Sequence, residues 1–330
     1  MSTINSINGP ISISDLGWTL SHEHLTNGTS GMQDLPGICD TPERKQEIID
    51  RCIEALKRAK ASGVDSLIDL TPFDLGRQAW LFESVAEQYD EYDVNIICAT
   101  GVYRWIPSIF FAWDIDEIAS YFSRELTEGI AGSSIKAGII KLAWDFEARL
   151  DEGPGSPRMQ LEKTARAAAR AARATGSPIS CHTRAADKLG LPLLDIFEDE
   201  GLDLGAVTIG HSNDTSDMTY LTEIAKRGAV VGLDRFFSTD EAYVAERSEI
   251  ALNLVQAGFA KQISLGHDGS PAGFFGRWKD ADTVNLDVWK LVPDYEVPWL
   301  RDHGVSDSDI RLITVDSVAQ TFLTAKNLIG

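Results

Sequence analysis

The sequence predicts an α/β protein, a (β/α)8 TIM barrel formed as a single domain over residues 1–330. Three observations support this fold class. Eight short apolar runs rich in β-branched residues recur along the chain and predict strands that are buried on both faces. Most intervals between them carry a helical pattern, which implies parallel βαβ units. No Gly-x-Gly-x-x-Gly fingerprint follows the first run, and eight units favour a closed barrel over an open sheet.

Each predicted strand is too short for a typical helix. The strands are expected at residues 18–22, 66–71, 95–100, 138–142, 178–182, 206–211, 229–233 and 262–267. The most clearly marked helices are expected to follow Thr41-Pro42, to run from Ser156-Pro157 to Gly176, and to span 114–129, 214–228 and 238–258. Serine or threonine before a first-turn proline is typical of a helix start, and glycine is typical of a helix end.

Two connections are predicted to be long and irregular, at about residues 25–41 and 269–297. They follow the first and eighth strands, and the loops after the strands of such a barrel form its active-site face. Aromatic residues between glycines in the second loop favour either a mobile apolar pocket wall or a surface that packs against a second subunit. These aromatic residues are Phe274, Phe275, Trp278 and Trp289.

The charge balance of the chain narrows the possible partners. Its 30 basic and 50 acidic residues give a net charge of −20, which repels nucleic acid and anionic membrane surfaces. The start of the sequence carries neither a basic n-region nor an apolar h-region, and the four cysteines form no Cys-x-x-Cys pair. We therefore expect a cytoplasmic protein with neither nucleic acid nor membrane as a partner.

Histidines gather where the predicted strands end. Five of the six in the chain lie at or just past such an end, namely His22, His24, His182, His211 and His267. Strand side chains alternate, so His22 and His24 are expected to point to one side while Glu23 points away. Two imidazoles on one side can hold a metal ion, although the pair alone is equally consistent with a polar end to a strand.

Two further polar residues end predicted strands. Lys141 closes an apolar run, where a buried ammonium is costly; either its head reaches solvent, or the lysine is chemically altered or paired with a metal. Asp268 follows the eighth strand and can ligate a metal or accept a proton. His267, one residue earlier, is expected to face the other way and to support the site from behind.

The chain resembles the phosphotriesterase family of the amidohydrolase superfamily along nearly its whole length. The resemblance depends on the order and spacing of several motifs. They are His22-Glu23-His24, Ala99-Thr100-Gly101, Gly138-Ile139-Ile140-Lys141, His182-Thr183, Gly210-His211-Ser212-Asn213-Asp214, Gly232-Leu233-Asp234-Arg235 and Gly266-His267-Asp268.

This resemblance implies a binuclear centre of two divalent ions, with zinc expected and cobalt, manganese or iron as alternatives. His22, His24 and Asp268 would hold one ion, His182 and His211 the other, and Lys141, carboxylated by CO₂, would bridge them. Such ions lower the pKa of a bound water to about 7, so that it is held between them as hydroxide. Asp268 would take the proton. Asp214 would pass it outward, unless Asp214 is instead the N-cap of the following helix.

The resemblance also bears on the substrate. Tyr103 and Arg235 occupy places where phosphotriesterases typically carry Trp and His, and they resemble the phosphotriesterase-like lactonases. Tyr103 would orient a lactone ring, and Arg235 would position Tyr103 or the loops. Residues 210–215 are closer to the phosphotriesterase form. The expected function is therefore opening of lactones, preferably N-acyl-homoserine lactones, by a homodimer.

Other functions compete with this expectation. The main alternative is a phosphotriesterase (aryldialkylphosphatase) or another carboxyl-ester hydrolase on the same site. A deaminase of the superfamily is disfavoured because it normally lacks the lysine ligand and carries a His-x-x-Glu pair. A barrel without catalysis is disfavoured because all six expected metal-site positions are filled.

Overall fold

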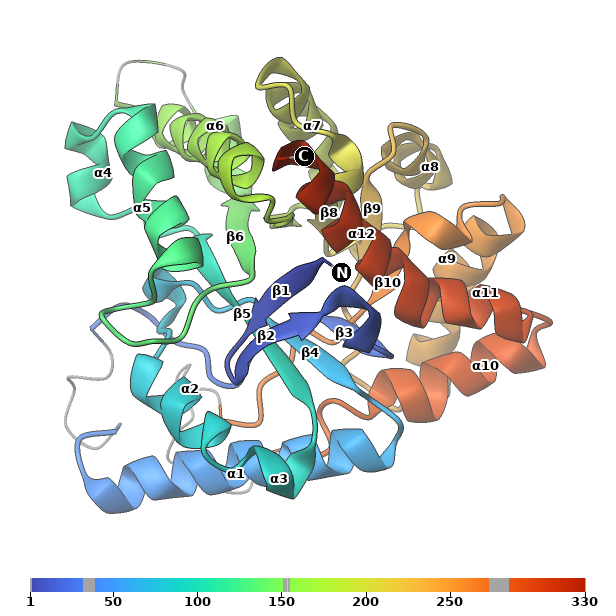
Figure 1. Ribbon diagram of the computed structural model, residues 1–330. Helices are drawn as coiled ribbons and strands as arrows, with labels where there is room; N and C mark the ends of the chain where they lie inside the picture. Colours follow the sequence, from blue (N-terminus) through green and yellow to red (C-terminus); the bar gives the residue numbers. More distant parts are fainter. Residues whose placement is uncertain (1, 32–38, 151–152, 154, 273–284, 330) are drawn as a thin grey trace.

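Eight parallel strands form the centre of the computed structural model, which describes residues 2–31, 39–150, 153, 155–272 and 285–329 (Figure 1). They are hydrogen-bonded in the order of the sequence. The strands are β3 (Thr19–Glu23), β4 (Ser66–Asp69), β5 (Asn95–Val102), β6 (Ile139–Trp144), β7 (Ile179–Thr183), β8 (Val207–Gly210), β9 (Val230–Leu233) and β10 (Ile263–Leu265). Each overlaps one predicted strand, and most ends differ by one or two residues.

The last strand meets the first, as a barrel requires. A parallel bridge joins Glu23 to Gly269. The backbone N–H of Asp268 donates to His22 O at 2.9 Å, and that of His24 donates to Gly269 O at 3.0 Å. The predicted fold class, an α/β barrel, is therefore confirmed. These contacts also bring residues from the two ends of the chain to one edge of the barrel.

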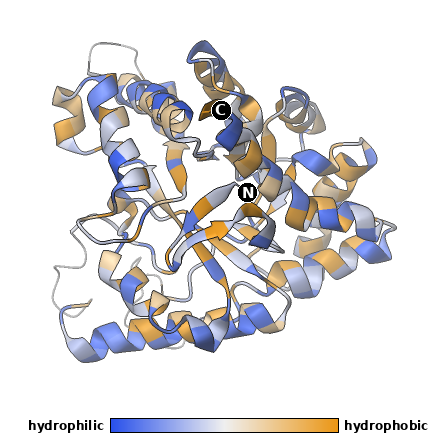
Figure 2. Ribbon diagram, viewed as in Figure 1, coloured by the Kyte–Doolittle hydropathy of each residue, from blue (hydrophilic) through white to orange (hydrophobic). Residues whose placement is uncertain are grey.

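Helices surround the strands (Figure 1). Figure 2 shows largely apolar strands and helices that carry both polar and apolar residues, as expected for helices that cover a buried sheet. Among the described residues, no helix is both long and apolar enough to span a membrane. The helices are α1 (Pro42–Ala61), α2 (Ala79–Ala86), α3 (Tyr89–Tyr92), α4 (Ser108–Ala112), α5 (Ile115–Thr127), α6 (Pro157–Thr175), α7 (Gly190–Asp199), α8 (Met218–Lys226), α9 (Glu241–Gln256), α10 (Val297–Asp302), α11 (Asp307–Arg311) and α12 (Ser317–Lys326).

The predicted helix caps are present. The Thr41 hydroxyl accepts from the backbone N–H of Arg44 at 3.2 Å, directly before Pro42. Ser156 caps α6 in the same way, and Gly176 ends that helix in the left-handed conformation. Such caps satisfy N–H and C=O groups that have no partner within the helix.

A hairpin that the sequence did not predict covers the amino-terminal end of the barrel. It consists of β1 (Thr3–Ser6) and β2 (Gly9–Ser12), paired antiparallel. Its Ile4 packs with Ile97 and Ile139 in a small apolar cluster. The amide of Asn5 donates to two backbone carbonyls, at 2.9 and 2.8 Å. A hairpin of two short strands is marginal alone, and the barrel above it provides the burial it needs.

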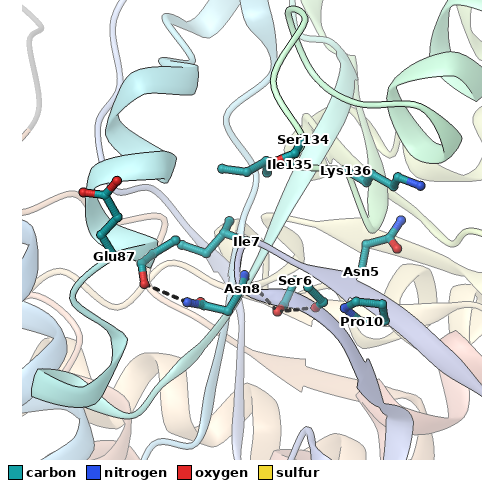
Figure 3. Close-up of a pocket in the computed structure, with 11 residues that line it drawn as sticks. Asn5, Ser6, Ile7, Asn8, Pro10, Glu87, Ser134, Ile135 and Lys136 are labelled. Carbon is teal, nitrogen blue, oxygen red and sulfur yellow. Dashed lines mark hydrogen bonds between the residues drawn. The ribbon is translucent and has the colours of Figure 1, made fainter.

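A cavity of about 530 Å³ lies beside this hairpin (Figure 3). Asn5 and Asn8 line it from the hairpin, Glu87 from the end of α2, and Ser134 and Lys136 from the connection to β6. It lies where the strands begin. Barrel enzymes place their chemistry at the opposite end, where the strands finish.

The second long loop differs from its prediction. Residues Val292–Glu296 form a π-helical turn that continues into α10, so irregular chain ends before residue 297. Prolines stand in the first turn of both segments, where a missing N–H is tolerated. Trp289 is fully buried and donates to Gly269 O at 3.3 Å, so it belongs to the core rather than to a pocket wall. Phe274, Phe275 and Trp278 lie outside the described residues.

Candidate metal centre

A small cavity of about 190 Å³ lies at the carboxyl ends of the strands. All six residues that the family resemblance implied as ligands line this cavity, together with five more. The six are His22, His24, Lys141, His182, His211 and Asp268. They come from β3, β6 and β7 and from the residues just after β3, β8 and β10. The barrel thus brings together side chains up to 246 residues apart (268 − 22).

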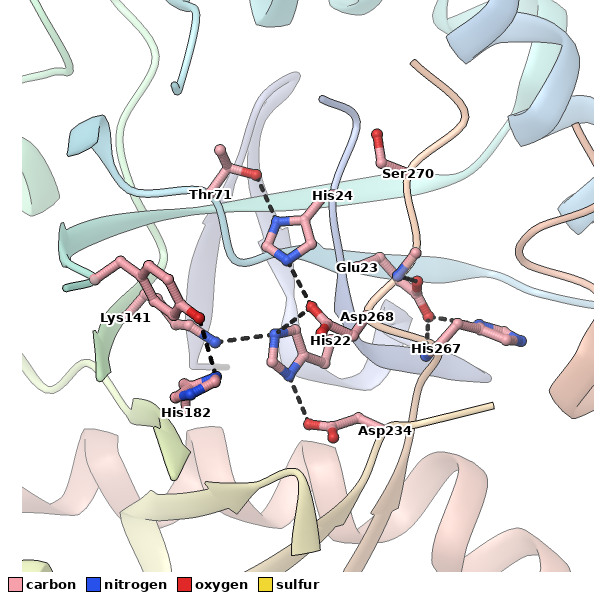
Figure 4. Close-up of polar contacts among 12 residues, drawn as sticks. His22, Glu23, His24, Thr71, Lys141, His182, Asp234, His267, Asp268 and Ser270 are labelled. Carbon is pink, nitrogen blue, oxygen red and sulfur yellow. Dashed lines mark hydrogen bonds and ion pairs between the residues drawn. The ribbon is translucent and has the colours of Figure 1, made fainter. Parts of the chain in front are cut away.

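His22, His24 and Asp268 meet in the arrangement that alternation along β3 predicted (Figure 4). The Nε2 of His24 lies 2.9 Å from Asp268 Oδ1, and the Nε2 of His22 lies 3.4 Å from the same oxygen. One atom from each residue lies within 4.8 Å of the others, as a metal site requires. Asp268 adopts a left-handed φ of 54°, which is strained for a residue other than glycine. The barrel contacts at His22 hold it there.

His24 is held in one tautomer by its neighbour Thr71. The Thr71 hydroxyl donates to Thr26 O at 3.1 Å. Its oxygen therefore accepts from His24 Nδ1–H, 2.8 Å away. His24 Nε2 is thereby directed into the cavity, where it meets Asp268 Oδ1 and where a metal ion could bind both atoms.

Asp234, at the end of β9, fixes two further rings. Its Oδ2 accepts from His22 Nδ1 at 2.5 Å, and its Oδ1 accepts from His211 Nδ1 at 2.8 Å. Oδ1 also accepts from the His211 backbone N–H at 2.7 Å. Burial opposes ionisation, but the two histidines hold the pKa of Asp234 well below its usual range. Burial and Lys141 lower the pKa of His22 to about 3, so its ring is neutral.

His182 is oriented in the opposite sense. Its Nε2 donates to Asp145 Oδ2 at 2.8 Å, which leaves the Nδ1 lone pair for the cavity. The Tyr103 hydroxyl lies 3.4 Å from that Nδ1. Burial and His211 lower the pKa of His182 to about 3, so this ring is neutral as well. Asp145 is in turn 3.4 Å from the guanidinium of Arg104.

Lys141 is buried at the centre of the group. Its Nζ lies 2.9 Å from His22 Nε2. Burial lowers the pKa of this lysine to about 8, although Asp268 and Asp234 work in the opposite direction. A substantial fraction of the amine is therefore neutral near pH 8, and the alternative in which the head reaches solvent is wrong. A neutral amine is the form that can react with CO₂.

The donor atoms fit divalent ions that prefer nitrogen and oxygen ligands. Four imidazole rings, one carboxylate and one buried lysine face a common space. A second trio, His22, His211 and Asp234, also brings ligand atoms within 4.8 Å. There the carboxylate already accepts both Nδ1 hydrogens, and Asp234 is 1% exposed. Asp234 thus holds the two rings from behind, and the space open to a metal ion is the cavity.

Tyr103 lines the cavity, and Arg235 contacts one of its lining residues, Asp268. Asp74, fully buried, accepts from the backbone N–H of Tyr103 at 2.8 Å and thereby holds the chain after β5. The Arg235 guanidinium lies 2.9 Å from Asp268 Oδ2 and 3.6 Å from Asp214 Oδ2. Burial raises the pKa of the Tyr103 hydroxyl above its ordinary value, so it is a hydrogen-bond donor at neutral pH.

Two expectations about neighbouring residues are resolved. Asp214 does not cap the next helix: Asp217 caps α8, accepting from two backbone N–H groups at 3.0 and 3.2 Å. His267 supports the site from behind, as predicted. Its Nδ1 donates to Glu23 at 2.6 Å, and its Nε2 accepts from the backbone N–H of Val292 at 2.9 Å.

Sequence reasoning missed Asp234, Asp145 and Thr71 as parts of the site. Each stands at or just after the carboxyl end of a strand, and that position was the available signal. Asp234 was noted only as part of a family motif. Ligating histidines almost always donate their second N–H to an acceptor. Polar residues at other strand ends are therefore candidates for that acceptor.

The barrel and the convergent histidine, aspartate and lysine side chains define the class: a metal-dependent hydrolase with its site at the carboxyl ends of the strands. Residues 2–322 match the phosphotriesterase family. The chain belongs to this family, and the function is therefore that of a hydrolase.

Several relatives support the assignment. A phosphotriesterase homology protein of Mycobacterium tuberculosis is 33% identical over 334 residues, covering 98% of each chain. An aryldialkylphosphatase of Saccharolobus solfataricus is 32% identical, covering 93% of this chain and 95% of its own. An N-acetyltaurine hydrolase of Dictyostelium discoideum is 26% identical, covering 83% of this chain and 72% of its own. The solved structure of the phosphotriesterase from M. tuberculosis superposes with a TM-score of 0.84 at 33% identity, covering 97% of this chain and 98% of that one.

Proposed function

We propose that the protein opens lactones, preferably N-acyl-homoserine lactones, on a binuclear metal centre. The observation that carries this proposal is that Tyr103 lines the cavity while Arg235 contacts Asp268, another residue of its lining. The phenol offers a neutral donor 3.4 Å from the Nδ1 of His182, where a ring oxygen or carbonyl of a small ester would lie next to the metals. The guanidinium holds the catalytic aspartate.

In this proposal His22, His24 and Asp268 hold one ion, and His182 and His211 hold the other. Zinc is the proposed metal, with cobalt, manganese or iron as alternatives. When bound, two such ions lower the pKa of water to about 7 and polarise the carbonyl oxygen of the substrate. Lys141 joins the ions after its neutral amine forms an N–C bond with CO₂ and releases one proton to solvent, giving an anionic carbamate.

Asp268 is the proposed general base. The surrounding histidines hold its pKa well below the usual range despite burial, so it is ionised and ready to take a proton from the attacking water. General acid–base help of this kind contributes about 10²–10⁴ in rate. Its Oδ2 faces Arg235, and its Oδ1 faces His24. The carboxylate is therefore positioned on both sides.

Asp214 remains the proposed outward acceptor of the proton. Arg235 lies between the two aspartates but keeps its own proton throughout, because a guanidinium does not deprotonate in proteins. Asp214 is about two-fifths exposed, with a side-chain exposure of 39%. The proton therefore leaves Asp268 by way of water to Asp214, and Asp214 also helps to fix Arg235.

A phosphotriesterase or other ester hydrolase is the second candidate. The similarity to the aryldialkylphosphatase of S. solfataricus favours it. The two candidates share the ligands and differ in the side chains at the rim. A lactone is planar at its carbonyl carbon whereas a phosphotriester is tetrahedral at phosphorus, so we expect the phenol of Tyr103 to meet the two substrates in different geometry.

The test compares metal-loaded protein on γ- and δ-lactones, acyl-homoserine lactones of several chain lengths, aryl esters and a dialkyl aryl phosphate. We expect the highest kcat/KM on an acyl-homoserine lactone. Tyr103→Phe is expected to lower lactone turnover more than phosphotriester turnover, and Tyr89→Phe on the outer surface is the matched control. A phosphotriester rate far above that of every lactone would overturn the lactonase proposal.

We also propose that the protein acts as a homodimer in the cytoplasm. Several large apolar side chains are exposed on the segment that follows β5 and on α4, among them Trp105, Ile109 and Phe111. Exposed apolar side chains that gather on one segment commonly mark a protein interface. Light scattering after size exclusion is expected to give twice the chain mass of 36.1 kDa, and a monomer at micromolar concentration would contradict it.

A further inference from the structure

We propose that Asp234 is a positioning residue that couples the two halves of the metal centre. Its single carboxylate fixes the tautomer of His22, a ligand of one proposed ion, and of His211, a ligand of the other. A change at Asp234 therefore weakens the binding of both metal ions together. This inference rests on the binuclear site of the proposed function.

The geometry distinguishes Asp234 from the other supporting groups. Its two oxygens are divided between the rings, with Oδ2 at 2.5 Å from His22 Nδ1 and Oδ1 at 2.8 Å from His211 Nδ1. The rings stack with centroids 4.9 Å apart and planes inclined by 29°. Thr71, by contrast, contacts His24, and Asp145 contacts His182.

The backbone around Asp234 leaves room for the carboxylate and little else. A Cβ on Gly210 would lie 2.9 Å from Asp234 Oδ2 and 3.5 Å from His22 Nδ1. At the adjoining end of β10, a Cβ on Gly266 would lie 2.9 Å from the backbone nitrogen of His22. The position of the carboxylate is therefore determined by a close-fitting cradle rather than by chance contact.

The chemistry explains why a carboxylate is needed. An ionised aspartate only accepts hydrogen bonds, so both facing rings must carry their proton on Nδ1. Each Nε2 lone pair then faces the cavity. Asparagine keeps the shape but presents an NH₂ group to one ring, which must move its proton to Nε2 and lose its ligand lone pair. The other ring keeps only a neutral acceptor, and its Nε2 becomes less basic.

The experiment titrates metal-free protein with Zn²⁺ and with Co²⁺, followed by calorimetry and by the cobalt absorption spectrum. Three variants are compared with the wild type: Asp234→Asn, Thr71→Val and Asp145→Asn. Loss of a hydrogen-bond partner behind a metal ligand typically costs about 10- to 100-fold in metal affinity. We expect Asp234→Asn to weaken both binding steps at least about 10-fold, and the other two variants to weaken one step each.

The outcomes separate this inference from the function. If the wild type binds two ions and Asp234→Asn weakens only one step, or neither, the coupling role is overturned while the binuclear hydrolase stands. If the wild type itself binds fewer than two ions, the proposed function fails.

A measurement on the wild type covers the case in which Asp234→Asn does not fold. In metal-free protein with ¹⁵N-labelled histidine, NMR is expected to show both His22 and His211 as the Nδ1–H tautomer, with no hydrogen on Nε2. Finding either ring as the Nε2–H tautomer would overturn the inference.

Discussion

The guanidinium of Arg235 and the carboxylate of Asp268 form a direct ion pair, with Nη1 2.9 Å from Oδ2. The other oxygen of Asp268 lies 2.9 Å from His24 Nε2. Although burial opposes it, Asp268 and Asp234 raise the pKa of Arg235 above its usual value. A permanent positive charge therefore holds the proposed base in one orientation at every physiological pH.

Arg235→Lys is expected to lower kcat/KM about 10- to 100-fold while leaving the folded structure intact. Lysine keeps the charge but loses the planar fork that contacts Asp268 and Asp214 together. Steady-state kinetics on the best lactone measures the effect. Arg184→Lys, at an exposed ion pair with Asp187, is the matched control and should change the rate less than about 2-fold. Equal rates for Arg235→Lys and wild type would rule out the positioning role.

Lys141→Gln is expected to lower the metal content below two ions per chain and to reduce turnover by at least about 100-fold, because the anionic bridge between the ions is removed. Metal analysis and kinetics are performed on the same samples. Lys188→Gln replaces an exposed lysine that pairs with Asp217 and serves as the control. Two retained ions with undiminished activity in Lys141→Gln would contradict the bridging role.

Glu296 makes stability depend on pH. It is buried against Ser248, and burial raises the pKa of its carboxyl from 4.5 to about 8. The folded state therefore keeps this proton up to about pH 8, whereas the unfolded chain releases it near 4.5. The protonated carboxyl therefore contributes fully to stability below about pH 4.5, and this contribution is lost as the pH rises to about 8. Over that range the free energy of unfolding falls by at most about 1.4 kcal/mol per pH unit.

Glu296→Gln is expected to remove that dependence. Urea unfolding of metal-free protein at several pH values is the measurement. Between pH 5.5 and pH 8, the free energy of unfolding of the variant should rise relative to that of the wild type, because glutamine does not titrate. Glu249→Gln, on the exposed side of α9, should follow the wild-type curve. Parallel curves for Glu296→Gln and wild type would show that this carboxyl is not buried as a neutral acid.

Gly101→Ala tests how tightly β5 and β6 pack beneath the site. Its φ is +117°, and an added Cβ would overlap the Lys141 carbonyl oxygen. Gly258 also has a positive φ, +88°, but its Cβ would meet nothing within 4 Å. We expect about 1 kcal/mol of destabilisation for Gly258→Ala and at least about 3 kcal/mol for Gly101→Ala, measured by urea unfolding. Equal losses would mean that the strands can separate to admit a methyl group.

The strands and the side chains that line the cavity could be predicted from the sequence because each depends on local pattern. The run before Lys141 is apolar, and the lysine stands out in it without knowledge of its neighbours, although β6 continues past Lys141 to Trp144 instead of ending there. The alternation His22, Glu23, His24 gives side-chain direction directly. The family resemblance then supplied the roles of these residues.

The supporting residues could not be predicted because their partners lie far away in the chain. Asp234 contacts His22 across 212 positions, and only the closed barrel brings them together. The hairpin of β1 and β2 could not be predicted for the same reason, because Ile4 is buried only once the barrel that it packs against has formed. Trp289 is buried in the core instead of lining a pocket wall or a subunit interface, because neighbouring aromatic residues do not reveal which of them turns toward the core.

The most direct test of the account is anomalous diffraction from crystals of the zinc-loaded protein, recorded at the zinc edge. The account predicts two peaks about 3.5–4 Å apart in the cavity. One should be bound by His22, His24 and Asp268 and the other by His182 and His211, with density extending the side chain of Lys141 between them. A single peak, or a peak located among His22, His211 and Asp234, would contradict it.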